Sequence, residues 1–178
     1  MKLKFKMAAA VFLTGSVLVS SPAFASKKSD AKKEIENLNQ KIKESGDKGD
    51  LQTAITAAED ALDAATKGFG ENSLEAAKAT MNVANLYMYA DHAADAERLY
   101  KNAILIQMNK KVDPNGPEMA DSYYNLAMAY AVQKKYDEGR DLLNKCYKIR
   151  AQRLGENHPD TQKARKALDD VWNEAAAS

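Results

Sequence analysis

The side chains best suited to chemistry are few and widely separated in this sequence. Its two histidines, His92 and His158, fall in expected turns, and neither has a cysteine or second histidine at metal-ligand spacing. The carboxylate pair Asp169–Asp170 lies on a charged helical face, where acidic side chains are ordinarily solvated. The sequence also lacks a glycine-rich phosphate loop and a Gly-x-Ser-x-Gly elbow. It therefore predicts a protein that is not an enzyme and that needs neither a cofactor nor a metal.

Cys146 is the only cysteine, so an intramolecular disulfide is impossible even in an oxidising compartment. A lone cysteine in an exported protein can be a reactive thiol. Here the residue occupies a regularly spaced helical position that other helices fill with Ala61 and Ala103. This equivalence favours a small buried core residue, whose replacement by alanine costs little stability.

The first 25 residues have the order of an export signal. Three lysines at positions 2, 4 and 6 precede an apolar run over 7–19, and Ala23 and Ala25 place small residues before a cleavage point. We predict a signal peptide over 1–25, with export to the periplasm favoured and secretion left open. The alternative is an uncleaved anchor, although the apolar run is shorter than a membrane span. Ser26 stands where a lipoprotein would need cysteine.

The chain that remains after cleavage is almost neutral, with 23 basic and 25 acidic residues. This balance gives no electrostatic reason to expect nucleic-acid binding. No later stretch is apolar enough to span a bilayer, so no stable membrane insertion is expected after signal cleavage. The length suits a single domain.

Internal repetition organises the rest of the sequence. The tetrad Phe-Gly-Glu-Asn at 69–72 returns as Leu-Gly-Glu-Asn at 154–157, and Asn-Val-Ala at 82–84 returns as Asn-Leu-Ala at 125–127. These matches define a period of 42 to 43 residues. Within each period apolar residues recur every three or four positions, which predicts two amphipathic helices joined by a short break.

The predicted fold is all-α, with about three stacked antiparallel helical hairpins and a C-terminal capping helix. Residues 26–50 form an N-terminal helix and turn, a degenerate first half-repeat, and residues 51–178 form the repeat domain. The capping helix covers 159–175 and has no partner after it. The remaining helices are expected over 30–44, 51–66, 75–89, 93–108, 118–132 and 136–153.

The second full repeat resembles the tetratricopeptide repeat. Leu126–Ala127 and Tyr130 hold the packing positions of its first helix, Gly139 the small position at the helix crossing, and Leu143 and Cys146 positions of its second helix. The long period resembles the kinesin-light-chain type. The resemblance extends over 51–172 and is poor over 30–48. It implies an α-solenoid whose first helices line a concave surface, where peptide ligands of the family usually bind.

Excluding the packing positions leaves the side chains that would face this surface. The methionines among them suit varied partners, the tyrosines offer rigid area with a polar tip, and the asparagines can bond a peptide backbone. The lysines could hold an acidic or C-terminal carboxylate group. The alternatives are core packing for the methionines and tyrosines, bonding to a neighbouring turn for the asparagines, and solvation for the lysines. The predicted groove residues are Lys78, Met81, Asn82, Asn85, Met88, Tyr89, Asp121, Tyr124, Asn125, Met128, Lys163 and Lys166.

The sequence thus predicts an interaction module that binds a peptide or protein segment, while the identity of that partner stays open. The alternative is a structural or self-associating accessory subunit that uses its convex or terminal faces. In that case Leu168, Val171 and Trp172 of the capping helix would control the oligomeric state, which the sequence does not specify.

Overall fold

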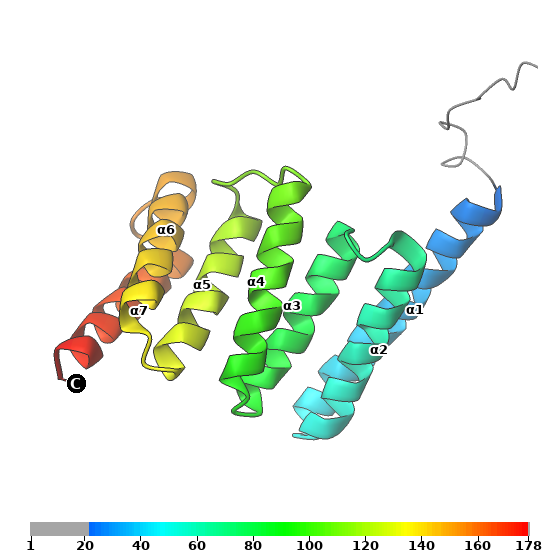
Figure 1. The fold of residues 1–178 in the computed structure, drawn as a ribbon, viewed down its shortest axis with the longest axis horizontal. Coiled ribbons are helices and arrows are strands. Elements are labelled where there is room, and N and C mark those ends of the chain that lie inside the picture. The colour runs from blue at the N-terminus through cyan, green and yellow to red at the C-terminus, as the bar shows by residue number, and fades with distance from the viewer. Residues whose placement is uncertain (1–21, 178) are drawn as a thin grey trace, which may run out of the picture.

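The computed structural model describes residues 22–177, and it forms seven helices in this part of the chain (Figure 1). Their bounds are α1 Pro22–Asp47, α2 Leu51–Phe69, α3 Leu74–Tyr89, α4 Ala93–Asn109, α5 Pro117–Val132, α6 Tyr136–Leu154 and α7 Pro159–Ala177. The described residues contain no strand. The predicted all-α class is therefore confirmed.

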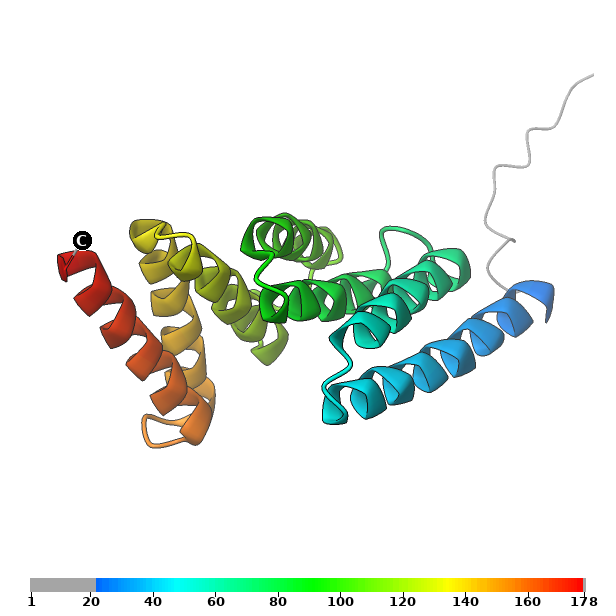
Figure 2. The ribbon, with the colours of Figure 1, turned by 90° about the horizontal axis from the view of Figure 1, so that it is seen from below.

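Each helix packs mainly against the helices next to it in the sequence, and α3 also meets α5. The helices consequently form a single row from α1 to α7 (Figure 1), and the row is curved when it is viewed from below (Figure 2). The pairs α1–α2, α3–α4 and α5–α6 are hairpins, and α7 closes the end of the row against α6. This arrangement confirms the predicted three hairpins with a capping helix.

Local sequence signals explain where the helices begin. Asp50 accepts a hydrogen bond from the backbone N–H of Thr53 at 3.1 Å, and Ser73 accepts one from that of Ala76 at 3.0 Å. Such N-caps satisfy backbone donors that lack partners within the helix. Pro117 occupies the first turn of α5, where its missing N–H costs little.

The turns inside the three hairpins share one backbone feature. In each turn, the residue two positions before the start of the second helix has a positive φ: 72° at Gly49, 61° at Asp91 and 61° at Lys134. These positions are 42 and 43 residues apart, which equals the sequence period. The repeat is therefore present in the turn geometry as well as in the helices.

Small residues let the paired helices approach closely. Gly139 is buried, and a Cβ atom there would lie 3.2 Å from the carbonyl oxygen of Ala127. Ala84 and Ala96 are fully buried at the crossing of α3 and α4, with Tyr100 packed beside them. The small positions identified from the repeat are thus at helix crossings, and larger side chains fill the space around them.

Several helices extend beyond the predicted limits. Helix α1 begins at Pro22, before the expected start at 30, and it continues through Gly46 into the expected turn. The side of Gly46 is open, so nothing there forces the helix to end. The last four residues of the predicted signal peptide form the first turn of α1, and its other residues lie outside the described residues. The signal peptide remains a prediction.

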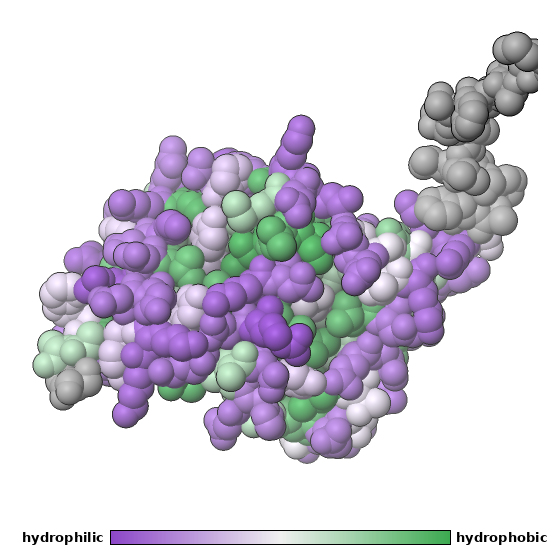
Figure 3. All heavy atoms as spheres, in the orientation of Figure 1, coloured by the Kyte–Doolittle hydropathy of each residue, from purple (hydrophilic) through white to green (hydrophobic). Residues whose placement is uncertain are grey.

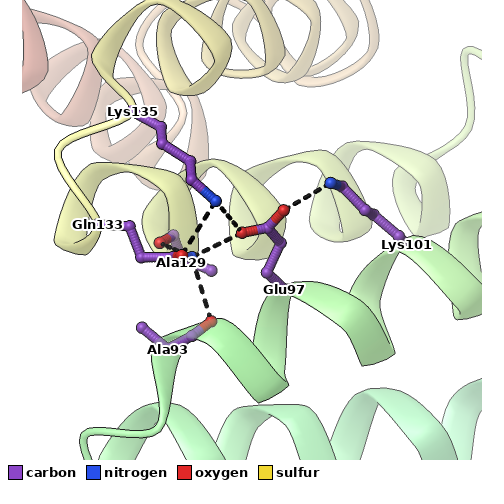
Figure 4. Close-up of polar contacts among 6 residues, drawn as sticks. All are labelled: Ala93, Glu97, Lys101, Ala129, Gln133 and Lys135. Atoms are coloured by element: carbon purple, nitrogen blue, oxygen red, sulfur yellow. Dashed lines mark hydrogen bonds and ion pairs between the residues drawn. The ribbon is translucent and has the colours of Figure 1, made fainter.

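A polar cluster connects the second hairpin to the third (Figure 4). Glu97 of α4 is 9% exposed and accepts hydrogen bonds from Lys101 at 2.5 Å, Lys135 at 2.7 Å and Gln133 at 2.8 Å. Gln133 also donates to the carbonyl of Ala93 at 3.3 Å. Because Gln133 and Lys135 lie in the α5–α6 turn, the cluster fixes that turn against α4.

The face formed by α2, α4 and α6 in Figure 1 is mostly hydrophilic, with apolar surface gathered over the middle of the row (Figure 3). On α4, Leu105 and Met108 are more than half exposed. No helix in the described part of the chain is long and apolar enough to cross a membrane.

Replacing Thr161 with valine is expected to stabilise the protein by about 1 kcal/mol. Thr161 is fully buried in the first turn of α7, and its hydroxyl has no hydrogen-bond partner among the described residues. Valine has nearly the same shape and removes the cost of burying that hydroxyl. Urea denaturation of the Thr161→Val variant measures the change, and a loss of stability would indicate an unrecognised partner for the hydroxyl.

Cys146 is expected to resist alkylation until the protein unfolds. Its side chain is fully buried, and burial raises the pKa of the thiol from 9.0 to about 11. The nucleophilic thiolate is therefore scarce at neutral pH, and the reagent has no access to it. Iodoacetamide should label the native protein far more slowly than the urea-unfolded protein. Equal rates would contradict the core placement.

Candidate binding groove

An open cavity of about 340 Å³ lies between α1 and α3, the first helices of neighbouring hairpins. Its apolar wall comes from Ile35, Phe69 and Ala79. Asn39 of α1 and Asn82 of α3 both line it, and their carboxamides can donate and accept hydrogen bonds. Charged residues of both signs complete the lining: Lys32, Glu36, Glu75 and Lys78.

A second cavity of about 330 Å³ lies between α5 and α7, toward the other end of the row. Met128, Ala131 and Val171 supply apolar lining, and Tyr124 supplies an aromatic ring. The remaining lining comes from α7, where Lys163 and Lys166 precede Ala167, Asp170 and Glu174. The two cavities therefore have a similar composition, with an apolar part beside charges of both signs.

Two cations lie over the ring of Tyr124. The guanidinium of Arg150 lies 5.2 Å from its ring centroid, and the ammonium of Lys163 lies 5.0 Å from it. Burial raises the pKa of Tyr124, so the phenol stays neutral. Arg150 also donates to Asp121 at 2.7 Å and to the carbonyl of Asp160 at 3.0 Å. The ring thus has a fixed place where α5, α6 and α7 meet.

Side chains fill the space between α3 and α5. Met81 and Met88 are half-buried and pack against the core cluster around Ala84 and Leu126. The sulfur of Met81 also lies 3.3 Å from the hydroxyl of Ser122 on α5. The contacts of these methionines are therefore with the core of the array.

The structure brings six of the twelve predicted groove residues to the two cavities: Lys78, Asn82, Tyr124, Met128, Lys163 and Lys166. Asn85 and Asp121 instead have partners on second helices, Tyr100 and Arg150 respectively. Tyr89 is 78% exposed near the end of α3, and Asn125 is half-buried on α5. The assignment of all twelve residues to a binding surface stays a prediction.

Sequence reasoning missed the contribution of α1 to this surface. Lys32, Ile35, Glu36 and Asn39 line the first cavity, and Phe69 reaches it from the end of α2. The available signal was the apolar stripe that Ile35 forms with Leu38 and Ile42. That stripe marks α1 as the first helix of a hairpin. The side of α1 that faces the next first helix could have been predicted from it.

The described residues contain no group of three or more histidine, cysteine or carboxylate side chains that could hold a metal ion. His92 lies near Tyr87, with ring centroids 6.1 Å apart. His158 accepts a hydrogen bond from the backbone N–H of Asp160 at 3.2 Å. Both histidines thus have structural contacts in turns.

Comparison with known proteins agrees with the resemblance seen in the sequence. Residues 119–160 match the family model described as tetratricopeptide repeat. This segment runs from the start of α5 to the start of α7, so it contains the third hairpin. The predicted resemblance is confirmed for this hairpin. None of the curated proteins compared with the chain matches it significantly.

Solved structures extend the likeness to most of the chain. A putative kinesin light chain from Podosopora anserina with TPR-like repeats has a TM-score of 0.70 at 21% identity, covering 83% of this chain and 68% of that one. The TPR2B domain of yeast Sti1, in a pHsp70 complex, has a TM-score of 0.60 at 18% identity, with 79% and 98% covered. The first TPR of Spaghetti (RPAP3), bound to an HSP90 peptide, has a TM-score of 0.59 at 16% identity, with 82% and 95% covered. These likenesses establish the TPR-like fold.

Proposed function

We propose that the protein is a non-catalytic interaction module that holds a peptide or protein segment against the surface lined by α1, α3, α5 and α7. One observation carries this proposal: two cavities lie between first helices toward opposite ends of the row, and each combines apolar walls with polar groups. Ligand sites commonly combine a largely apolar wall with a few oriented polar groups. Two such sites on one array suit a segment with two apolar anchors.

The proteins of similar fold support this assignment. One of them is solved as a complex with pHsp70, and another is bound to the HSP90 peptide SRMEEVD. In this chain both cavities carry lysines and carboxylates together, so no single charge dominates. We therefore infer that apolar anchoring and backbone hydrogen bonds contribute more to recognition than net charge does.

Export to the cell envelope is part of the proposal and rests on the leader sequence. N-terminal sequencing of the protein recovered from a periplasmic fraction tests it directly. Ser26 is expected at the N-terminus, as cleavage after Ala25 requires. Recovery of the intact leader in the cytoplasm would contradict export without affecting the groove.

Replacing Asn82 and Asn125 with alanine together is expected to weaken peptide binding at least about fivefold, since each change removes about 0.5–1.5 kcal/mol of hydrogen bonding. The folded structure should persist, because Asn82 is exposed, Asn125 is half-buried, and neither holds a core position. Peptides selected by phage display on the wild-type protein provide the probe, and fluorescence anisotropy measures their affinity.

Asn102→Ala is the matched control, because Asn102 is an exposed asparagine on the second helix α4. It should bind the selected peptides with wild-type affinity. Equal affinity of the double variant and the wild type would overturn the groove assignment. Circular dichroism and thermal unfolding show whether any loss of binding reflects unfolding instead.

The alternative, self-association through the end of the array, depends on the outer face of α7. Val171 is buried in the core of the chain itself, and Leu168 is half-buried against it. Trp172 is 58% exposed and carries the guanidinium of Arg140 at 5.1 Å from its ring. A single exposed ring beside a cation is a small apolar surface, so we assign the main function to the groove. Analytical ultracentrifugation of Trp172→Ala tests the alternative.

A further inference from the structure

A cavity of about 280 Å³, here called the outer cavity, lies between α6 and the loop that joins α4 to α5. Helix α5 contributes one side chain to it, Tyr123, whereas the next residue, Tyr124, lines the groove cavity between α5 and α7. The outer cavity and the groove therefore lie on different sides of α5. The lining of the outer cavity consists of Pro114, Asn115, Tyr123, Lys145, Lys148, Ile149 and Gln152.

The charges that line the outer cavity have a single sign. Both groove cavities combine lysines with carboxylates, but the charged groups of the outer cavity are the ammonium groups of Lys145 and Lys148. Neither lysine forms an ion pair with another described residue. Both are exposed and lie three residues apart on α6, where neighbouring like charges repel. A carboxylate placed between them would offset this repulsion.

Contacts around the outer cavity fix its loop. Arg153 of α6 donates a hydrogen bond from Nε to the carbonyl oxygen of Asn115 at 3.0 Å, and its guanidinium pairs with the carboxylate of Asp113. Asp113 also accepts a hydrogen bond from the backbone N–H of Asn115 at 2.9 Å. The carboxylate of the loop is thus engaged by Arg153 and by the loop itself, and it does not line the outer cavity.

The outer cavity also has an apolar wall. Tyr123 packs against the core cluster that contains Ile149, and the ammonium of Lys145 lies 5.8 Å from the centroid of the Tyr123 ring. An apolar wall beside two ammonium groups fits a carboxylate side chain together with an apolar neighbour. Small-molecule sites start at about 300 Å³, so a cavity just below this volume suits one or two side chains of a larger partner.

Helix α4 adds apolar surface to the same face of the array. Leu105 of α4 is equivalent to Lys148 of α6, 43 residues later, and equivalent positions of stacked repeats face the same way. Leu105 is 56% exposed, and Met108, about one turn further along α4, is 60% exposed. A partner that covers α4 and α6 together would meet these apolar side chains as well as the lysines, whereas a small anion would use the lysines alone.

We propose that the outer cavity and the exposed apolar side chains of α4 form a second docking surface, which binds an acidic and apolar segment of a partner protein. A carboxylate of this segment lies between Lys145 and Lys148. Its apolar side chains contact Tyr123, Leu105 and Met108. The surface belongs mainly to second helices, so a partner can occupy it while another segment occupies the groove. The inference goes beyond the proposed function of the groove and does not depend on it.

The probe is a fluorescein-labelled peptide of alternating glutamate and leucine, with a second peptide in which glutamine replaces every glutamate. Fluorescence anisotropy should show tighter binding of the glutamate peptide to the wild-type protein. Lys145→Gln combined with Lys148→Gln should weaken this binding about three- to tenfold, as expected for the loss of two exposed ion pairs. The affinity of the glutamine peptide should be the same for both proteins.

Lys41→Gln combined with Lys43→Gln is the matched control, because it removes the same charge from exposed lysines of α1 that line neither cavity. It should bind the glutamate peptide with wild-type affinity. Lysine acetylation by sulfosuccinimidyl acetate, followed by mass spectrometry, tests the wild-type protein without a substitution. The bound peptide should slow the acetylation of Lys145 and Lys148 and leave that of Lys41 and Lys43 unchanged.

Several outcomes would overturn the inference. These are failure of the glutamate peptide to bind the wild-type protein, undiminished binding by the Lys145→Gln, Lys148→Gln variant, and an equal loss in the control variant. Displacement of the peptide by inorganic phosphate, but not by sodium chloride of equal ionic strength, would instead assign the outer cavity to a small anion. Dimerisation in ultracentrifugation that this variant abolishes would assign the surface to a second copy of the chain.

The groove variant separates this inference from the proposed function. Asn82→Ala combined with Asn125→Ala should bind the glutamate peptide as the wild type does. A loss of affinity there would place the peptide in the groove and would overturn the second docking surface alone. Failure of the groove would appear only with the peptides selected by phage display, and it would leave the acetylation result at Lys145 and Lys148 unchanged.

Discussion

Gly68→Ala is expected to destabilise the protein by about 1–3 kcal/mol, although alanine is normally the better residue inside a helix. Gly68 is buried near the end of α2, and a Cβ atom placed there would lie 2.2 Å from the Cβ of Ala31 on α1. No side-chain rotation can relieve a contact between two Cβ atoms, so the helices themselves must separate. Urea denaturation monitored by circular dichroism measures the loss.

Gly46→Ala provides the matched control on the partner helix. Gly46 also lies inside a helix, but a Cβ atom there would meet nothing within 4 Å. This variant should therefore gain up to about 1 kcal/mol from the better helix propensity of alanine. The combination of Gly68→Ala with Ala31→Gly should recover part of the lost stability, because it removes the other Cβ atom. Stabilisation by Gly68→Ala alone would show that α1 and α2 do not cross at this point.

The repeat period made the arrangement of the array predictable. Once helices recur every 42 to 43 residues, each hairpin must bury its apolar side against its neighbours, and stacking follows. The same alignment located Gly139 and Cys146, because small residues recur where helices cross. Both are buried in the structure. The sequence period carries this information because equivalent helix–helix contacts recur in every repeat.

The first hairpin was harder to predict because its sequence departs from the repeat. In α1 the apolar positions are sparse, and charged residues surround Ile35 and Leu38. The close contact of Ala31 with Gly68 has no counterpart in the alignment that located Gly139. It depends on two residues that are 37 positions apart and on the crossing point of two particular helices.

The candidate site was predictable in outline, while the roles of individual side chains were not. Excluding core positions identifies which side of a first helix is free, and Asn82 and Tyr124 from the predicted set line the two cavities, although Tyr124 also packs against the core. The exclusion does not reveal partners on other helices. Asn85 pairs with a residue 15 positions away and Asp121 with one 29 positions away, so their contacts appear only when the hairpins are assembled.

The Glu97 cluster also joins residues that are distant in the sequence. Its removal is expected to have a large effect on the stability of the protein. Glu97→Gln should destabilise the protein by about 2 kcal/mol at neutral pH, because hydrogen bonds to a charged and buried group are stronger than neutral ones. The substitution keeps the shape of the side chain but removes the charge that Lys101 and Lys135 neutralise (Figure 4). Denaturant unfolding of the two proteins at pH 7 measures the difference.

The pH dependence of this difference has a defined sign. Burial by itself raises the pKa of Glu97, but hydrogen bonds from Lys101, Lys135 and Gln133 outweigh it and lower the pKa from 4.5 to about 2. A depressed pKa in the folded state stabilises the protein above pH 4.5, and this contribution is lost as the pH falls from there toward 2. The gap between wild type and Glu97→Gln should therefore be constant from pH 7 to about 5 and should narrow in more acidic solution.

A surface ion pair serves as the control for the Glu97→Gln prediction. Asp63 and Lys67 also form a short pair one helical turn apart, but their side chains are 59% and 71% exposed. Solvent screens such a pair, so Asp63→Asn should leave stability unchanged within error at any pH. Glu97 differs because its side chain is only 12% exposed and because two of its partners, Lys135 and Gln133, belong to the next hairpin. If Glu97→Gln proved as silent as Asp63→Asn, the charge of Glu97 would not contribute to fixing the α5–α6 turn against α4.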